Sequence, residues 1–128
     1  MLLTGVVNAD TGKLVVEVTD LKLSTGKLRF ALFDSDEKFF REAVTYGEAE
    51  VANNAATWIV NDLPFGTYAV TVHHDVNGNG ELERHWYGKP KEPTGASNNP
   101  SRKLGPPNFK KSKFDFKSAE LTLNIEVR

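Results

Sequence analysis

Hydrophobic and polar residues alternate along four separate runs of the chain, and this pattern limits the folds available to it. The runs cover residues 14–19, 28–32, 68–72 and 121–127. Successive side chains of a β-strand point to opposite faces, so alternation predicts strands with one face in a core and the other in solvent. A shorter run at 57–60 predicts a further strand, and weaker runs surround 48–51 and 114–116. We therefore expect an all-β chain of about seven strands.

Turn signals separate these runs at residues 24–26, 63–66 and 77–80. Glycine, proline and asparagine at these points supply the fixed or positive φ angles that tight turns need. Several short strands with regular turns favour a sandwich or a barrel. The chain has 128 residues, the length of one domain. We expect residues 1–128 to form a single antiparallel β-sandwich of prealbumin-like or immunoglobulin-like type.

The composition excludes several classes of function. The chain has no cysteine, which excludes disulfides, thiolate metal sites and a cysteine nucleophile. Its net charge of −1 gives no global bias toward nucleic acid, and no run approaches the ~18 apolar residues of a membrane span. The chain lacks a Gly-x-Ser-x-Gly elbow, a phosphate-binding glycine loop and an HExxH motif. We therefore expect a protein that binds a partner instead of an enzyme, and a hydrolase is an alternative.

Two segments depart from the alternating pattern. Residues 35–45 carry Phe39, Phe40, Ala43 and Val44 at helical spacing, which predicts a short helix or turn packed on one edge of the sandwich. Its phenylalanines are expected to cover the core. Residues 86–113 are rich in proline and glycine and show no period, which predicts a long irregular loop. Loops of this length in compact domains are usually functional or disordered.

The irregular loop is strongly basic, and the rest of the chain is acidic. Seven positive residues face one acidic residue, Glu92, which leaves the loop at +6 and the remaining chain at −7. The positive residues are Lys89, Lys91, Arg102, Lys103, Lys110, Lys111 and Lys113. Such a cluster predicts binding of an anionic glycan, a phosphate or an acidic protein, whereas nucleic acid is disfavoured because basic and aromatic residues do not interleave. Trp86 opens the loop and either stacks on a ligand or covers the end of the sandwich.

Residues 75–83 have the spacing of half a calcium loop. Side-chain oxygens stand at positions one, three and five, and a glycine at six permits a sharp bend that lets the next carbonyl point inward. The expected ligands are Asp75, Asn77, Asn79, Glu81 and Glu83. Position twelve is Trp86 instead of the glutamate of an EF-hand, and Asp34, Asp36 or Glu92 are the candidates to complete the site. The same residues also suit a metal-free hairpin turn, since Asn-Gly occurs twice.

Histidines flank this turn on both sides. His73 and His74 are adjacent in a predicted strand and face opposite ways, so we expect His74 on the inner face and His73 outside. A transition-metal site would require one of them to meet His85 across the turn. The alternative is a hydrogen-bonded histidine at the end of the sandwich.

Several short motifs resemble, in order, those of one bacterial family. They occupy residues 32–35, 74–83, 88–92, 95–99 and 105–109. Together they resemble the domain of unknown function 2141 (DUF2141) family over residues 14–127, with Ala96 in place of an aromatic residue. Residues 63–70 also resemble a turn of prealbumin-like and carboxypeptidase-regulatory-like sandwiches.

The family resemblance implies a secreted or periplasmic bacterial β-sandwich with no known reaction. The first seven residues lack the basic region and apolar core of a signal peptide. The resemblance also implies an ordered loop, so we expect Ser97, Asn98 and Asn99 to lie close to His74 and Asp75. Together with His74, these three residues are further candidates for ligand binding. We therefore expect a cell-envelope binding module with calcium at 75–83. The alternatives are an anionic ligand or envelope protein bound by the basic loop, and a sandwich that pairs through an edge strand.

Overall fold

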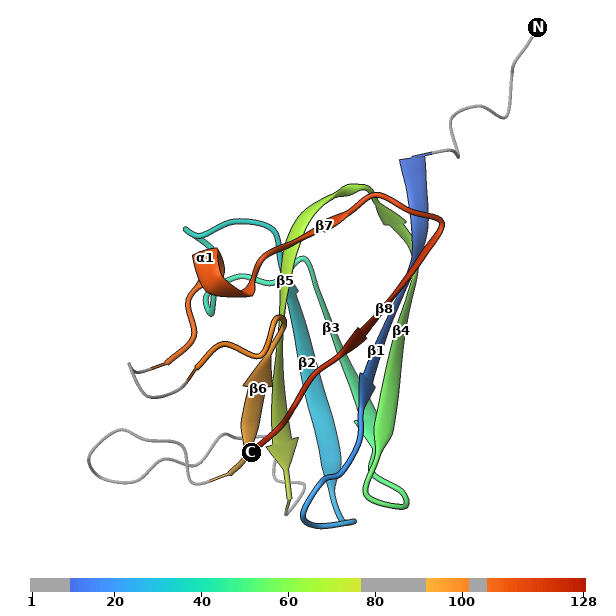
Figure 1. Cartoon of the computed structure of the whole chain (residues 1–128), viewed down its shortest axis with the longest axis vertical. Coiled ribbons are helices and arrows are strands. Elements are labelled where there is room, and N and C mark those ends of the chain that lie inside the picture. Colours follow the sequence, from blue (N-terminus) through green and yellow to red (C-terminus); the bar gives the residue numbers. More distant parts are fainter. Residues whose placement is uncertain (1–9, 77–91, 102–105) are drawn as a thin grey trace, which may run out of the picture.

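The computed structural model describes residues 10–76, 92–101 and 106–128. These residues form eight strands and one helical turn, and the strands run along the long axis of the molecule (Figure 1). In chain order the elements are β1 (Thr11–Val18), β2 (Lys27–Phe33), β3 (Thr45–Glu50), β4 (Ala56–Pro64), β5 (Gly66–Asp75), β6 (Thr94–Ala96), α1 (Phe109–Ser112), β7 (Phe114–Phe116) and β8 (Glu120–Asn124). No helix in these described ranges is long and apolar enough to cross a membrane.

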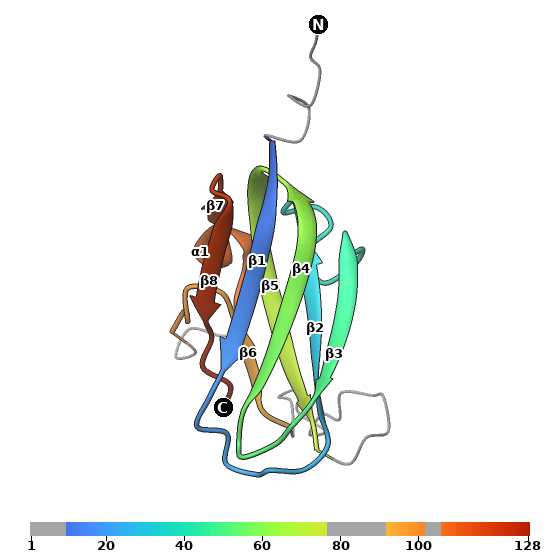
Figure 2. The same cartoon turned by 90° about the vertical axis from the view of Figure 1, so that its right-hand side faces the viewer.

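The strands form two sheets that pack face to face (Figure 2). One sheet has three strands in the order β4-β1-β8, and the other has five, in the order β3-β2-β5-β6 with β7 also paired to β5. This arrangement confirms the expected all-β sandwich. One pair differs from the antiparallel expectation, because β1 and β8 are parallel, with Lys13 beside Glu120 and Glu17 beside Asn124. Parallel neighbours need a long crossover, and nearly the whole chain lies between these two strands.

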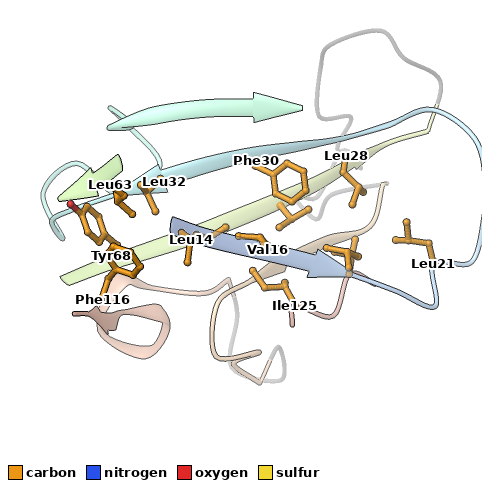
Figure 3. Packing of buried hydrophobic residues seen from close by; sticks show 14 of the residues in the cluster. Leu14, Val16, Leu21, Leu28, Phe30, Leu32, Leu63, Tyr68, Phe116 and Ile125 are labelled. Carbon is orange, nitrogen blue, oxygen red and sulfur yellow. The ribbon is translucent and has the colours of Figure 1, made fainter. Parts of the chain in front are cut away.

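The hydrophobic core lies between the inner faces of the two sheets (Figure 3). Leu14 and Val16 of β1 are fully buried, and they belong to one cluster with Leu28 and Phe30 of β2 and Val70 of β5. Each of these residues occupies the apolar position of an alternating run. The alternation therefore predicted correctly which face of each strand turns inward.

The two open sides of the sandwich are closed in different ways. On the side of β3 and β4, the Trp58 ring stacks on Phe30, with 5.1 Å between ring centroids. A Cβ atom at Gly47 would stand 2.1 Å from Nε1 of Trp58, so glycine is needed to leave room for the indole. On the other side, the chain end pairs with β6, where Thr94 and Arg128 exchange two backbone hydrogen bonds of 3.2 and 3.0 Å.

A second apolar cluster covers part of the outer face of the five-stranded sheet. Phe33 of β2 and Ala69 of β5 point away from the core and pack with Phe39 and Phe109. Phe39 belongs to a turn at residues 36–41, so the segment expected to be a short helix or turn is a turn. Phe39 is buried in this outer cluster and Phe40 is 57% exposed, so the phenylalanines of the segment do not cover the main core as expected.

The segment expected to be a long irregular loop contains two regular elements. β6 and α1 both fall within residues 86–113. The helix begins after Asn108, whose side chain accepts a hydrogen bond from the backbone N–H of Lys111 at 2.9 Å. Residues 86–91 and 102–105 of this segment lie outside the described part of the chain.

Candidate functional site

Charged side chains gather at one end of the outer face of the five-stranded sheet. His73 and Asp75 are two residues apart on β5 and point away from the core. The register of β2 sets Arg29 opposite His73 and Lys27 opposite Asp75. On β3, Glu48 lies opposite Arg29. Antiparallel pairing therefore brings charged residues of three strands into adjacent rows.

Asp75 is fully buried at the end of β5 and is held by an arginine. Nε of Arg29 donates to Oδ2 of Asp75 at 2.8 Å, and Nη1 of Arg29 donates to Oε2 of Glu48 at 2.6 Å. The hydrogen bond to Asp75 raises the pKa of Arg29, burial acts in the opposite direction, and the charge of Glu48 raises it further. The guanidinium therefore remains a fixed positive charge that orients the buried carboxylate.

Glu92 is the first residue of the segment 92–101, and its side chain lies at the same end of the sheet. Its side chain is buried, and its Oε1 atom lies 2.9 Å from Nε2 of His73. Its Oε2 atom accepts a hydrogen bond from the backbone N–H of Val76 at 2.9 Å. One ligand atom from each of His73, Asp75 and Glu92 lies within 4.8 Å of the other two. The three side chains therefore form a compact group that is able to surround one ion.

The same contacts join the two ends of residues 77–91. The backbone N–H of His74 donates to the carbonyl of Pro93 at 2.9 Å, and β6 then pairs with β5 from His73 onward. Glu92 and Val76 are linked directly by the side-chain bond described above. The chain thus leaves the sheet and returns to it at the same point, and the His73–Asp75–Glu92 group lies at that point.

The inner side of this sheet end is also tightly packed. Nε2 of His74 lies 2.8 Å from the carbonyl oxygen of Thr25, and His74 is buried as expected. Gly26 adopts a φ of +74°, and a Cβ atom there would stand 2.2 Å from the carbonyl oxygen of Asp75. The turn between β1 and β2 therefore supports the backbone that carries the site.

Of the expected calcium ligands, Asp75 is described and occupies the centre of the charged group. Glu92 is the additional carboxylate that meets it. Asp34 and Asp36 do not, because β2 pairs with β5 so that Lys27 lies beside Asp75, whereas Phe33 lies beside Ala69. The other expected calcium ligands lie outside the described residues, namely Asn77, Asn79, Glu81 and Glu83. The same holds for five residues expected to bind a partner molecule, namely Trp86, Lys89, Lys91, Arg102 and Lys103.

The expectation that Ser97, Asn98 and Asn99 lie close to His74 and Asp75 is wrong. β6 runs antiparallel to β5, so the chain moves away from Asp75 as it approaches Ser97. The Ser97 hydroxyl accepts from the backbone N–H of Val70 at 3.0 Å. Five residues of strand separate Val70 from Asp75, about 16 Å at the usual rise.

These three residues instead tie neighbouring segments together. Nδ2 of Asn98 donates to the carbonyl of Lys113 at 2.7 Å. Asn99 donates to the carbonyl of Asn124 at 3.2 Å and accepts from the backbone N–H of Glu126 at 2.8 Å. Their side chains thus hold α1 and the end of β8 against β6.

Sequence reasoning did not assign Arg29 to the site, and it considered His73 only as a partner of His85 in a transition-metal site. A signal was available for His73, because it shares the outer face of its strand with Asp75. No sequence signal was available for Arg29, because its meeting with Asp75 depends on the register between strands 46 residues apart.

The fold and this site define a class of protein, a small all-β sandwich with a His–Asp–Glu group, whose two carboxylates are buried, at one end of its larger sheet. The sequence matches, over residues 16–124, the family model described as an uncharacterized protein conserved in bacteria (DUF2141). The chain belongs to this family, which confirms the resemblance seen in its motifs. Neither the characterised proteins nor the solved structures that were compared gave a match. The family description names no activity, so the function has to be argued from the site.

Proposed function

We propose that this chain is a binding module of the bacterial cell envelope in which a calcium ion organises the segment that follows β5. The observation that supports this most is the meeting of Asp75 and Glu92. These carboxylates flank residues 77–91 and stand together where that segment leaves and rejoins the sheet. A calcium ion between them would fix both ends of the segment at once.

The distances suit the oxygen shell of calcium. Calcium binds oxygen at about 2.3–2.6 Å, so oxygens on opposite sides of one ion stand about 5 Å apart. The ligand atoms of Asp75 and Glu92 lie within 4.8 Å of each other. The other ligands in this proposal are Asn77, Asn79, Glu81 and Glu83. We expect a dissociation constant in the range of calcium sites in extracellular modules, about 10⁻⁴–10⁻³ M.

We infer the binding role from the position of residues 77–91, which both follow and precede residues bonded to the larger sheet. Loops that are fixed at their base by a rigid scaffold are the usual carriers of binding function. Here the base is a group of charged residues on three strands of the larger sheet, with Asp75 fully buried among them. The family resemblance supports a secreted or periplasmic location for the module.

Isothermal titration of calcium chloride into the full chain tests the proposal. Asn79→Ala is the informative variant, because Asp75 is bonded to Arg29 and its replacement would also disturb folding. Asn53→Ala is a matched control on an exposed turn. We expect weak calcium binding to the wild type and to Asn53→Ala, and binding at least several-fold weaker in Asn79→Ala. Failure of the wild type to bind calcium at millimolar concentration would contradict the proposal.

An anionic partner is the second candidate, and the environment of Glu92 favours it. Glu92 is the one acidic residue of the basic loop, and it is buried against His73. Meanwhile Lys110, Lys111 and Lys113 are exposed at α1, which Asn98 holds in place. The acidic charge is thus turned inward while these lysines face solvent.

A sulfated glycan column tests this second candidate. We expect the wild type to be retained at low salt and released steeply as salt rises, because exposed charges are screened. A Lys110→Ala/Lys111→Ala variant should elute earlier than a Lys22→Ala control, since Lys22 is exposed outside the basic loop. Equal elution of the two variants would argue against this partner.

A further inference from the structure

We propose that His73, Asp75 and Glu92 form a binding site for a transition-metal dication of the zinc class. The site would use one imidazole nitrogen and two carboxylate oxygens, whose ligand atoms lie within 4.8 Å of one another. Its ligands include a histidine that the calcium proposal does not use, and none of them comes from residues 77–91. Zinc binding by these three residues therefore does not require the calcium ligands within residues 77–91.

The donor set indicates the class of ion. Calcium and magnesium take oxygen ligands almost exclusively, whereas imidazole nitrogen is a preferred ligand of zinc, copper, iron and nickel. Nε2 of His73 points at Oε1 of Glu92, so the nitrogen faces the other donors and not solvent. Zinc is bound in proteins by histidine nitrogen and by aspartate or glutamate oxygen, so all three donors are of kinds that zinc takes.

The spacing of His73 and Glu92 is close to that of two ligands on one metal ion. Zinc binds nitrogen and oxygen at about 2.0–2.2 Å, so two tetrahedral ligands stand about 3.3–3.6 Å apart. Nε2 of His73 and Oε1 of Glu92 are 2.9 Å apart. If these two atoms moved apart by a few tenths of an ångström, a zinc ion would fit in place of the proton that they share.

Both carboxylates are already oriented by contacts outside the group. The backbone N–H of Val76 holds Oε2 of Glu92, which directs Oε1 toward His73. Arg29 holds Oδ2 of Asp75 from the neighbouring strand. Such partners behind the ligands fix ligand orientation in metal sites and strongly affect metal affinity.

Burial also favours a cation at this point. Asp75 is fully buried and Glu92 is 8% exposed. Arg29 already compensates the charge of Asp75, and a dication within 4.8 Å of both carboxylates would also compensate the charge of Glu92 in this poorly solvated place. The site thus differs from an exposed acidic cluster, where water screens the charges.

Three protein ligands leave a coordination position for a further group. Zinc sites with three protein ligands hold water or a bound molecule at the fourth position. An ion held here would present that position at the place where residues 76 and 92 meet. A donor group of a partner molecule would be able to bind there directly.

Asp75 and Glu92 are ligands in both the calcium proposal and the zinc proposal. We therefore expect zinc and calcium to compete for binding to the chain.

Titration of zinc chloride into the tag-free full chain, followed by calorimetry, tests the site. His73→Gln is the informative variant, because glutamine is still able to donate to Glu92 but lacks the imidazole. His85→Ala is the control, since His85 belongs to the alternative in which a histidine across the turn binds the metal. We expect one zinc per wild-type chain, zinc binding at least about tenfold weaker in His73→Gln, and unchanged zinc binding in His85→Ala.

No zinc binding by the wild type would overturn the proposal, as would equal zinc affinity in the wild type and His73→Gln. Loss of zinc binding in His85→Ala alone would overturn it as well. Thermal unfolding of each variant shows that the compared chains are folded. Calcium titrations separate the two proposals, because His73→Gln should retain calcium binding and Asn79→Ala should retain zinc binding.

Discussion

The imidazole of His73 and the carboxylate of Glu92 meet at 2.9 Å, although they are 19 positions apart in the chain. The same carboxylate accepts a hydrogen bond from the backbone of Val76, so one side chain secures both a side-chain and a main-chain partner. Glu92 therefore fixes the start of residues 92–101 to the end of β5.

Replacement of Glu92 should measure the strength of this connection. Glu92→Ala leaves a partly buried imidazole and a backbone N–H without their acceptor, so we expect a loss of about 1–3 kcal/mol in the free energy of unfolding. Glu42→Ala is the control, because Glu42 is exposed and its pair with Lys38 lies on the surface. Its effect should stay within about 0.5 kcal/mol. Urea unfolding compares the two, and equal losses would show that Glu92 has no special role.

Gly26 should be irreplaceable next to the site. Its φ of +74° is unfavourable for a residue with a Cβ atom, and that atom would collide with the carbonyl of Asp75. We expect Gly26→Ala to lower the free energy of unfolding by more than about 1 kcal/mol. In Gly66→Ala the new Cβ would have its nearest contact at 3.5 Å, so this control should change stability far less. Similar melting temperatures for both variants would contradict the close approach of Gly26 to the carbonyl of Asp75.

Asn99 should behave as a structural residue. Asn99→Ala removes two hydrogen bonds to the C-terminal segment and also leaves alanine at a φ of +46°. Asn53 has a similar φ of +54°, and no side-chain hydrogen bond is seen for it within the described residues. The difference between Asn99→Ala and Asn53→Ala in chemical denaturation thus reports the two bonds, and we expect about 1–3 kcal/mol. If the two variants were equally stable, the bonds of Asn99 would not account for this residue, and Asn99 would again be a candidate for ligand binding.

Tyr68 should make the fold sensitive to alkaline pH. Burial raises the pKa of Tyr68, the negative charge of Asp34 adds to this, and its hydroxyl donates to the carbonyl of Pro64 at 2.7 Å. Above pH ~10 the unfolded chain loses a proton that the folded chain keeps, so the free energy of unfolding falls as pH rises through the folded-state pKa. Tyr68→Phe should be about 1 kcal/mol less stable at neutral pH but should lose less stability above pH ~10. Parallel pH profiles of the two proteins would exclude this contribution.

Side-chain alternation was sufficient to predict the sandwich and its inner faces. Leu14, Phe30 and Val70 are buried where the period of two places them. The same period put His74 inside and His73 outside, as the structure has them. Alternation is reliable here because a shift of one residue would expose the apolar face of a whole strand.

The composition of the site required information that the sequence does not carry. Arg29 meets Asp75 only because of the register between β2 and β5. Glu92 follows a stretch of sequence without a hydrophobic period, so the sequence does not show which way its side chain points. Asn98 and Asn99 looked like ligand residues because of their motif, yet their left-handed backbone and their bonds to other segments explain an asparagine pair at this place.

Thermal unfolding in calcium and in chelator tests the central proposal most directly. A ligand that binds the folded chain alone stabilises it, and about 1 mM calcium at a dissociation constant of about 0.1 mM contributes about 1.4 kcal/mol. We predict that the melting temperature of the wild type rises by about 3–6 °C in calcium relative to chelator, and that Asn79→Ala shows little or no rise. The same melting temperature for the wild type in calcium and in chelator would contradict a calcium-organised segment.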